Sequence, residues 1–114
     1  MIVKTQNNRP TYVKRKLDTV INITKIVTLH YFEFDKNFVF PGEVHDFWEM
    51  VYVDGGEVLI NADKTSHVLK QGEIIFHKPN EFHTISSNKK TPANVFVISF
   101  ATASKSMLYF RKRI

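Results

Sequence analysis

Hydrophobic residues occur along most of this chain in short runs that alternate with polar positions and are separated by turn residues. Alternation with a period of two is typical of strands that bury one face. We expect eight strands, over residues 23–34, 38–40, 47–54, 57–61, 67–70, 73–77, 83–87 and 94–101. No helical stripe precedes residue 104. Many short strands in one chain predict an all-β sandwich or barrel.

Length and composition indicate one domain. The chain has 114 residues, of which 43% are hydrophobic and 13% aromatic, enough for a single core. It contains no cysteine, which excludes a disulfide scaffold and a thiolate metal site and fits a reducing cytoplasm. No run approaches 18 apolar residues, so we expect no membrane partner.

The formal charge of +5 is concentrated at the two ends. Residues 1–16 hold five basic residues and no acid, whereas residues 17–110 hold eight lysines and all eleven acids. Two short basic tails without a recognition helix do not predict sequence-specific DNA binding. We expect a basic N-terminal arm over 1–17 and a barrel over 18–101.

The last residues change period. Ser104 is a candidate N-cap, and Met107, Leu108 and Phe110 share one face of a helix that would follow it. A basic run, 111–113, is favourably placed near the C-terminus of such a helix. We expect 102–114 to begin a short helix that links or dimerises the domain.

The strand expected over 47–54 has one unusual face. Alternation divides its residues and their neighbours into two sets, His45, Phe47, Glu49, Val51 and Val53 on one face and Trp48, Met50 and Tyr52 on the other. The second set is apolar enough to require cover from outside the barrel. The first set places a carboxylate among hydrophobic residues. Because an unpartnered buried carboxylate costs several kcal/mol, Glu49 requires a partner or a wet cavity.

Candidate partners for Glu49 are His45, His83 and Glu43. Two imidazoles and two carboxylates suit a divalent ion such as Zn, Ni, Mn or Fe, and they also suit a metal-free ligand pocket or a hydrogen-bonded structural network. In a flat strand the Cα atoms of His45 and Glu49 lie about 13 Å apart, which is long for one shared ion. Only a bulge or strong curl brings them together.

Several other residues are candidates for the same pocket or for the core beside it. Phe47 and Phe96 are candidates to stack on a ligand, and alternation places Phe96 on one face with Ile98 and Phe100. His77 is expected to point inward as a satisfied core histidine. Two further histidines, His30 and His67, lie on expected surface strands and receive no role.

Two segments resemble cupin motifs. Residues 43–56, Glu-Val-His-Asp-Phe-Trp-Glu-Met-Val-Tyr-Val-Asp-Gly-Gly, resemble the first motif, in which a glutamate follows the second histidine by four residues and a glycine follows by seven more. Here His45 matches the second histidine and Glu49 the glutamate. Glu43 stands where that motif has its first histidine.

The second cupin motif has its counterpart in residues 72–83, Gly-Glu-Ile-Ile-Phe-His-Lys-Pro-Asn-Glu-Phe-His. In that motif a glycine begins a strand and a histidine follows a proline-containing corner, so His83 is the matching residue. The resemblance implies a cupin-type double-stranded β-helix, or jelly-roll, barrel. It also implies metal or ligand binding by the residues carried over.

The same two segments resemble, more specifically, the N-terminal sensor domain of AraC-type transcription regulators, over about residues 20–114. The resemblance implies a small-molecule effector, possible examples being sugars, and a homodimer. It implies contact with DNA only through a helix-turn-helix domain, which is absent from this chain. A stand-alone metal-binding cupin, with isomerase or oxygenase chemistry, is the alternative. Glu43 in place of the first histidine favours a non-enzymatic sensor.

Overall fold

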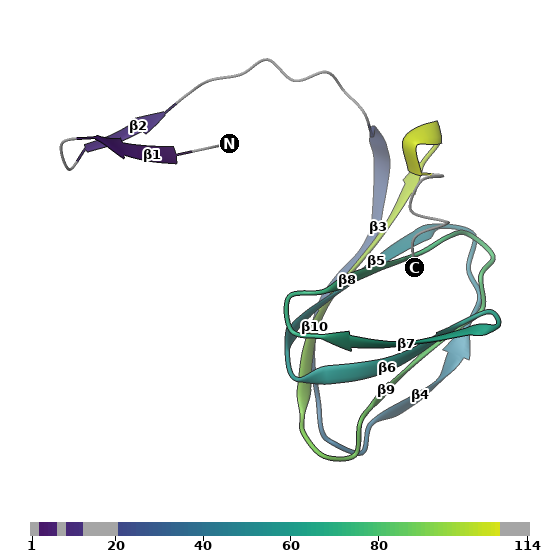
Figure 1. Cartoon of the computed structure of the whole chain (residues 1–114). Helices are drawn as coiled ribbons and strands as arrows, with labels where there is room; N and C mark the ends of the chain where they lie inside the picture. Colours follow the sequence, from purple (N-terminus) through teal and green to yellow (C-terminus); the bar gives the residue numbers. More distant parts are fainter. Residues whose placement is uncertain (1–2, 7–8, 13–20, 108–114) are drawn as a thin grey trace.

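The computed structural model describes residues 3–6, 9–12 and 21–107 of the chain. Two four-stranded antiparallel sheets face each other and form a barrel (Figure 1). One sheet has the order β3-β10-β5-β8 and the other β4-β9-β6-β7. The strands are β3 (Ile23–Phe34), β4 (Val39–Glu43), β5 (Trp48–Gly55), β6 (Glu57–Ala62), β7 (Thr65–Lys70), β8 (Ile74–His77), β9 (His83–Ser87) and β10 (Ala93–Thr102). The expected all-β barrel is confirmed.

The strand boundaries follow the alternation of the sequence. The strands expected over 23–34 and 83–87 have the bounds of β3 and β9, and the other six expected ranges overlap the remaining barrel strands.

The expected basic arm, 1–17, contains a feature that its polar sequence did not predict. Within it, β1 (Val3–Gln6) and β2 (Arg9–Tyr12) pair as an antiparallel hairpin. Residues 13–20 lie outside the described part of the chain.

The hydrophobic core lies between the two sheets. It is built from the inward-facing positions of β5, β6 and β10, where Val53, Val58 and Val95 are fully buried. Ile60 of β6 and Ile75 of β8 extend the same cluster. Because each of these residues is flanked by outward-facing neighbours, the core confirms the period-two pattern.

A second apolar cluster covers the outside of the first sheet. Trp48 and Phe100 are buried there against Met107 of the short 3-10 turn η1 (Lys105–Met107). The outer face of β5 therefore does require cover, as the sequence indicated, and residues after the barrel supply part of it. Of the helix expected over 102–114, Thr102 instead ends β10 and Lys105–Met107 form this turn, whereas residues 108–114 lie outside the described part.

The predicted N-cap role of Ser104 is only partly met. Its hydroxyl oxygen accepts a hydrogen bond from the backbone N–H of Asn22, at 2.8 Å, and not from the turn that follows. Its backbone carbonyl accepts from the N–H of Met107 at 3.1 Å. Ser104 therefore ties the start of the turn to the segment before β3.

Candidate functional site

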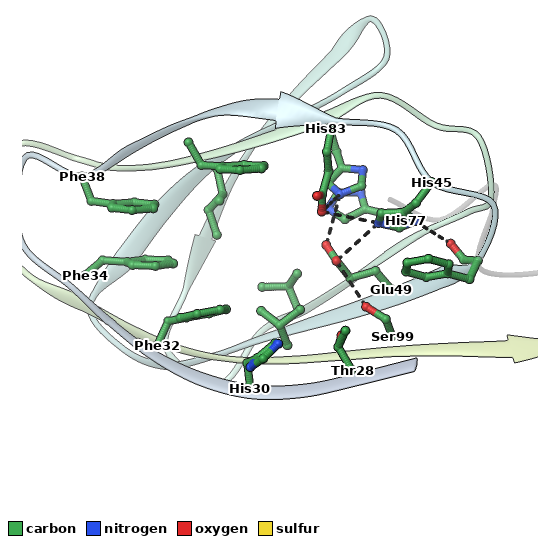
Figure 2. A pocket seen from close by; sticks show the side chains of 16 residues that line it. Thr28, His30, Phe32, Phe34, Phe38, His45, Glu49, His77, His83 and Ser99 are labelled. Atoms are coloured by element: carbon green, nitrogen blue, oxygen red, sulfur yellow. Dashed lines mark hydrogen bonds and ion pairs between the residues drawn. The ribbon is translucent and has the colours of Figure 1, made fainter. Parts of the chain in front are cut away.

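A pocket of about 460 Å³ lies between the two sheets. It is within the size range of small-molecule sites. Figure 2 shows a group of imidazole and carboxylate side chains facing it from one side and a row of phenylalanine rings from the other. The lining residues are Thr28, His30, Phe32, Phe34, Phe38, Phe40, Glu43, His45, Phe47, Glu49, Val51, His77, His83, Ile85, Val97 and Ser99.

Four of these residues converge on one spot, which we call the Glu/His cluster: Glu43, His45, Glu49 and His83. One ligand atom from each lies within 4.8 Å of the others. The Nε2 atom of His83 is 3.2 Å from Glu49 Oε2 and 3.3 Å from Glu43 Oε1. The Nε2 atom of His45 is 3.4 Å from Glu49 Oε1 and 3.5 Å from Glu43 Oε1. The cluster could hold a metal ion.

The bend before β5 brings His45 to Glu49. The strand begins at Trp48, residues 46 and 47 form a bend before it, and the His45 carbonyl accepts a 2.7 Å hydrogen bond from the N–H of Asn80. The imidazole stacks on the Phe47 ring, with centroids 4.0 Å apart. This local curl is the condition that the sequence required for the two side chains to share one ion.

Backbone carbonyls set the tautomers of both histidines. The Nδ1–H of His45 donates to the Phe47 carbonyl and that of His83 to the Glu81 carbonyl, each at 2.9 Å. A neutral imidazole that donates through Nδ1 presents a lone pair at Nε2. In the neutral state, two lone pairs and two carboxylates therefore face one another, and the buried Nε2 of His45 has no hydrogen-bond partner. A proton on one imidazole or a bound metal ion would satisfy such a set.

The geometry also fits an ion. Atoms about 2.1 Å from a shared ion in tetrahedral coordination lie about 3.4 Å apart. The four nitrogen–oxygen distances in the cluster run from 3.2 to 3.5 Å and involve both oxygens of Glu49. With one ligand atom taken from each residue, the set spans up to 4.8 Å, so the side chains would draw together around an ion. The donor set, two imidazoles and two carboxylates, suits Zn, Mn, Fe or Ni. The bonds from Nδ1 to backbone carbonyls are the orienting contacts typical of metal-binding histidines.

Without an ion, a proton on His83 takes its place. Burial by itself lowers the pKa of His83, but the hydrogen bonds to Glu49 and the Glu81 carbonyl, with the two nearby carboxylates, raise it to about 9. Burial would raise the pKa of Glu49, and the hydrogen bond and charge of His83 outweigh it, so this pKa is lowered. At neutral pH the pair is therefore ionised.

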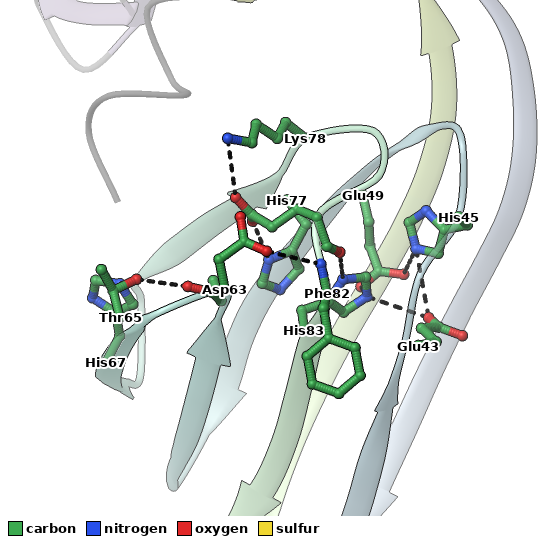
Figure 3. Close-up of polar contacts among 12 residues, drawn as sticks. Glu43, His45, Glu49, Asp63, Thr65, His67, His77, Lys78, Phe82 and His83 are labelled. Carbon is green, nitrogen blue, oxygen red and sulfur yellow. Dashed lines mark hydrogen bonds and ion pairs between the residues drawn. The ribbon is translucent and has the colours of Figure 1, made fainter.

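Behind the cluster lies a second buried histidine. The ring of His77 stacks on His83 with centroids 4.1 Å apart, and its Nδ1–H donates to Glu81 Oε1 at 3.2 Å (Figure 3). Lys78 Nζ is 3.9 Å from the other oxygen of Glu81. Burial, followed by the charge of His83, lowers the pKa of His77 to about 3, so it stays neutral. The prediction that His77 points inward is confirmed.

The structure brings five of the six predicted binding residues to the pocket: Glu43, His45, Phe47, Glu49 and His83. The placement of Phe96 was wrong. Its ring lies on the outer face of β10, next to Tyr31 at 4.6 Å and Tyr52 at 6.2 Å between centroids. Phe96 does group with Ile98 and Phe100, but the face that lines the pocket carries Val97 and Ser99.

A second correction concerns β3. His30 is exposed, as expected for a surface strand, but it also lines the pocket, as do Thr28, Phe32 and Phe34 of the same strand. These four residues alternate along β3, so the period-two pattern contained the signal. The strand carries large apolar residues on its other face too, since Leu29 and Tyr31 are exposed, and the pattern alone does not identify the inner face. No described contact brings His67 to the cluster, and it instead bonds Thr65.

Comparison with known proteins identifies a family model. Residues 27–104 match the model described as "AraC-like ligand binding domain". This range includes every residue that lines the pocket. No curated protein matches the sequence at a significant level.

Solved structures of cupins are similar in fold. A predicted oxalate decarboxylase from Thermotoga maritima has a TM-score of 0.64 at 17% identity, covering 68% of each chain. A cupin 2 conserved barrel domain protein from Rhodopseudomonas palustris has a TM-score of 0.60 at 17% identity, covering 78% of this chain and 68% of its own. The cupin domain of Drosophila melanogaster CENP-C has a TM-score of 0.58 at 15% identity, covering 62% and 55%. At these identities the likeness establishes the cupin fold alone.

Among the described residues, no helix is long and apolar enough to span a membrane.

Proposed function

We propose, since the chain belongs to the family of AraC-like ligand binding domains, that this barrel is a sensor for a small-molecule effector. The observation that carries the proposal is the pocket between the sheets, where ionisable and aromatic side chains converge on one space of about 460 Å³. A ligand switches such a protein only if it binds one arrangement more tightly than another. In the family, the sensor domain passes its signal to a DNA-binding domain. We propose that this chain is such a sensor domain and that it forms a homodimer.

The route out of the pocket runs through neighbouring residues of two strands. Glu49 faces the pocket and Trp48 the outside of β5, and Ser99 and Phe100 are placed likewise on β10. Glu49 and Ser99 are joined by a 3.4 Å hydrogen bond. A ligand that moves this pair shifts the two outer aromatic rings, on which Met107 packs. The segment that leaves the barrel is therefore mechanically coupled to the site.

A matched pair of variants tests the sensor. Thr28→Trp fills the pocket from β3, whereas Leu29→Trp adds the same side chain to the exposed face of the strand. We expect a thermal-shift panel of sugars, small carboxylic acids and aryl compounds to contain a stabiliser. At 100 times its Kd it adds about 2.7 kcal/mol, or about 10 °C in Tm. Thr28→Trp should abolish the shift and Leu29→Trp should retain it. A stabiliser that acts equally on both variants contradicts the proposal.

A divalent ion in the Glu/His cluster is a second candidate, favoured by the unpartnered Nε2 of His45. Glu43, His45, Glu49 and His83 would hold the ion, which when bound supplies a Lewis acid that polarises a ligand oxygen. The Phe47 and Glu81 carbonyls orient the two imidazoles, and the two carboxylates would neutralise the charge of the ion. The family match favours binding over turnover, so we propose a sensor and keep a metal-dependent enzyme as the alternative.

Titration calorimetry with Zn²⁺, Ni²⁺, Mn²⁺ and Fe²⁺ tests the ion. We expect one equivalent to bind and to raise Tm, and Glu43→Gln to weaken binding about 100-fold, because the variant removes one charged ligand at a half-exposed position. His67→Asn, outside the cluster, should bind as the wild type does. Absence of binding by all four ions would favour a metal-free pocket.

A further inference from the structure

We infer that the effector is an amphiphile, with one polar head at the Glu/His cluster and a flat or chain-like hydrocarbon body, and that it is not a free sugar. The inference rests on the proposed function, since it names the chemistry of the ligand that the sensor binds. It is carried by a polarity gradient along the pocket that both sheets share.

The first sheet carries the gradient in three rows across β3, β10 and β5. The row of Thr28, Ser99 and Glu49 is polar. The next row along the barrel consists of His30, Val97 and Val51 and is mostly apolar. The third consists of Phe32, Val95 and Val53 and has no polar side chain; Phe32 lines the pocket, and the two valines are buried in the core beneath it. Polarity therefore falls from one end of the sheet to the other.

The opposite sheet repeats the order. Glu43 of β4 pairs with His83 of β9, which is the polar level of the cluster. Phe40 pairs with Ile85 at the next level, and Ile85 pairs in turn with Ile60 of β6. Because His83 contacts Glu43 beside it and Glu49 across the pocket, the polar levels of the two sheets coincide. A ligand lying along the pocket meets charge at one end and hydrocarbon at the other.

The apolar end is built of aromatic rings. Phe34 and Phe38 stack in parallel with centroids 4.0 Å apart, and Phe32 continues the row at 5.7 Å from Phe34 (Figure 2). Phe32 lines the pocket and still has 39% of its surface exposed. Covering that surface with a hydrocarbon body removes apolar area from water at about 25 cal/mol per Å². The row of rings thus favours an apolar group opposite the cluster.

A free sugar does not match this gradient. Its hydroxyl groups surround the ring, so those that reach the second and third rows would be buried beside phenylalanine, valine and isoleucine. Each buried hydroxyl without a partner costs about 1–3 kcal/mol. Among the described lining residues of these rows, only His30 offers a hydrogen bond. Adjacent rows are two residues, or about 7 Å, apart, so head and body require a molecule longer than one sugar ring.

The test uses four probes on the full chain. 4-Phenylbutanoate and 4-phenylbutylamine share a body and differ in the head, and L-arabinose and D-glucose are polar all round. We expect at least one phenyl probe to bind by calorimetry and to raise Tm, with no shift from either sugar. In the wild type, nuclear Overhauser contacts should join the phenyl protons to Phe32 and Ile85.

A matched pair of variants locates the body. Phe38→Ser, in the ring row, should weaken the phenyl probe at least tenfold, and Phe96→Ser, on the outer face of β10, should leave it unchanged. If Phe38→Ser does not fold, the Overhauser contacts decide. If a sugar binds in the pocket and neither phenyl probe binds, the amphiphile proposal is wrong and the sensor proposal still holds. Binding that survives Thr28→Trp overturns both, and lack of binding by both phenyl probes overturns the amphiphile.

Discussion

Glu49→Gln is expected to lower the free energy of unfolding of the metal-free protein by about 3 kcal/mol at pH 7. The carboxylate is buried, with 7% of the residue exposed, and contacts His83, His45 and Ser99. Removing its charge leaves the protonated His83 imidazole in a buried site with only the half-exposed Glu43 as an acidic partner. Removal of one member of a buried ion pair costs about 3–5 kcal/mol. We take the lower end because His83 can lose its proton.

The effect depends on pH in a definite direction. The pKa of His83 is raised to about 9, so the stabilisation from its proton is complete below the unfolded value of 6.5 and is lost as pH rises through about 9. The difference between wild type and variant should therefore be largest near pH 6–7 and shrink towards pH 10. Urea unfolding in the presence of a chelator measures it.

Glu33→Gln is the matched control, since Glu33 is exposed on β3. It removes the same charge outside the cluster and should change the free energy of unfolding by no more than about 0.5 kcal/mol. If Glu49→Gln has an effect this small at every pH, the buried ion pair does not stabilise the barrel.

The sequence reveals the chemistry of this site better than its shape. A carboxylate at an inward position of a strand is visible in the alternation, and Glu49 is indeed buried. The convergence of His45 depends on a bend whose hydrogen bond comes from Asn80, 35 positions along the chain. A long-range backbone contact of this kind leaves no periodic signal in the sequence. The alternation could therefore show that a bend is needed to bring His45 to Glu49, but not that the chain forms one.

Which faces of β3 and β10 line the pocket was hard to predict for a different reason. Both strands are apolar on both sides, so alternation groups residues correctly but does not say which group is inside. On β10 the deciding residue is Ser99, which is 1% exposed and bonds Glu49. A small polar residue paired with the buried acid identifies the pocket face of β10. Phe96, three positions from Ser99, therefore lies on the opposite, outer face. On β3 the same row makes Thr28, and therefore His30, face inward.

The two glycines of the motif-like segments permit a sharper test of the fold. Gly56 and Gly72 both have positive φ, of 72° and 86°, a region that residues with a side chain rarely adopt. They differ in their surroundings. A Cβ on Gly56 would overlap the backbone oxygen of Pro92 and approach Ala93 Cα to 3.0 Å, whereas a Cβ on Gly72 meets nothing within 4 Å.

Gly72→Ala should therefore cost about 1–2 kcal/mol of stability, the conformational term alone. Gly56→Ala adds a clash with backbone atoms that cannot rotate away, so we expect it to cost about 4 kcal/mol or more. Urea unfolding of the two variants under identical conditions measures the difference. Since the two alanines share the strain of positive φ, the difference isolates the close approach of the turn after β5 to the start of β10. Equal losses would mean that this approach yields at little cost, and the glycine would then be required only for its backbone angle.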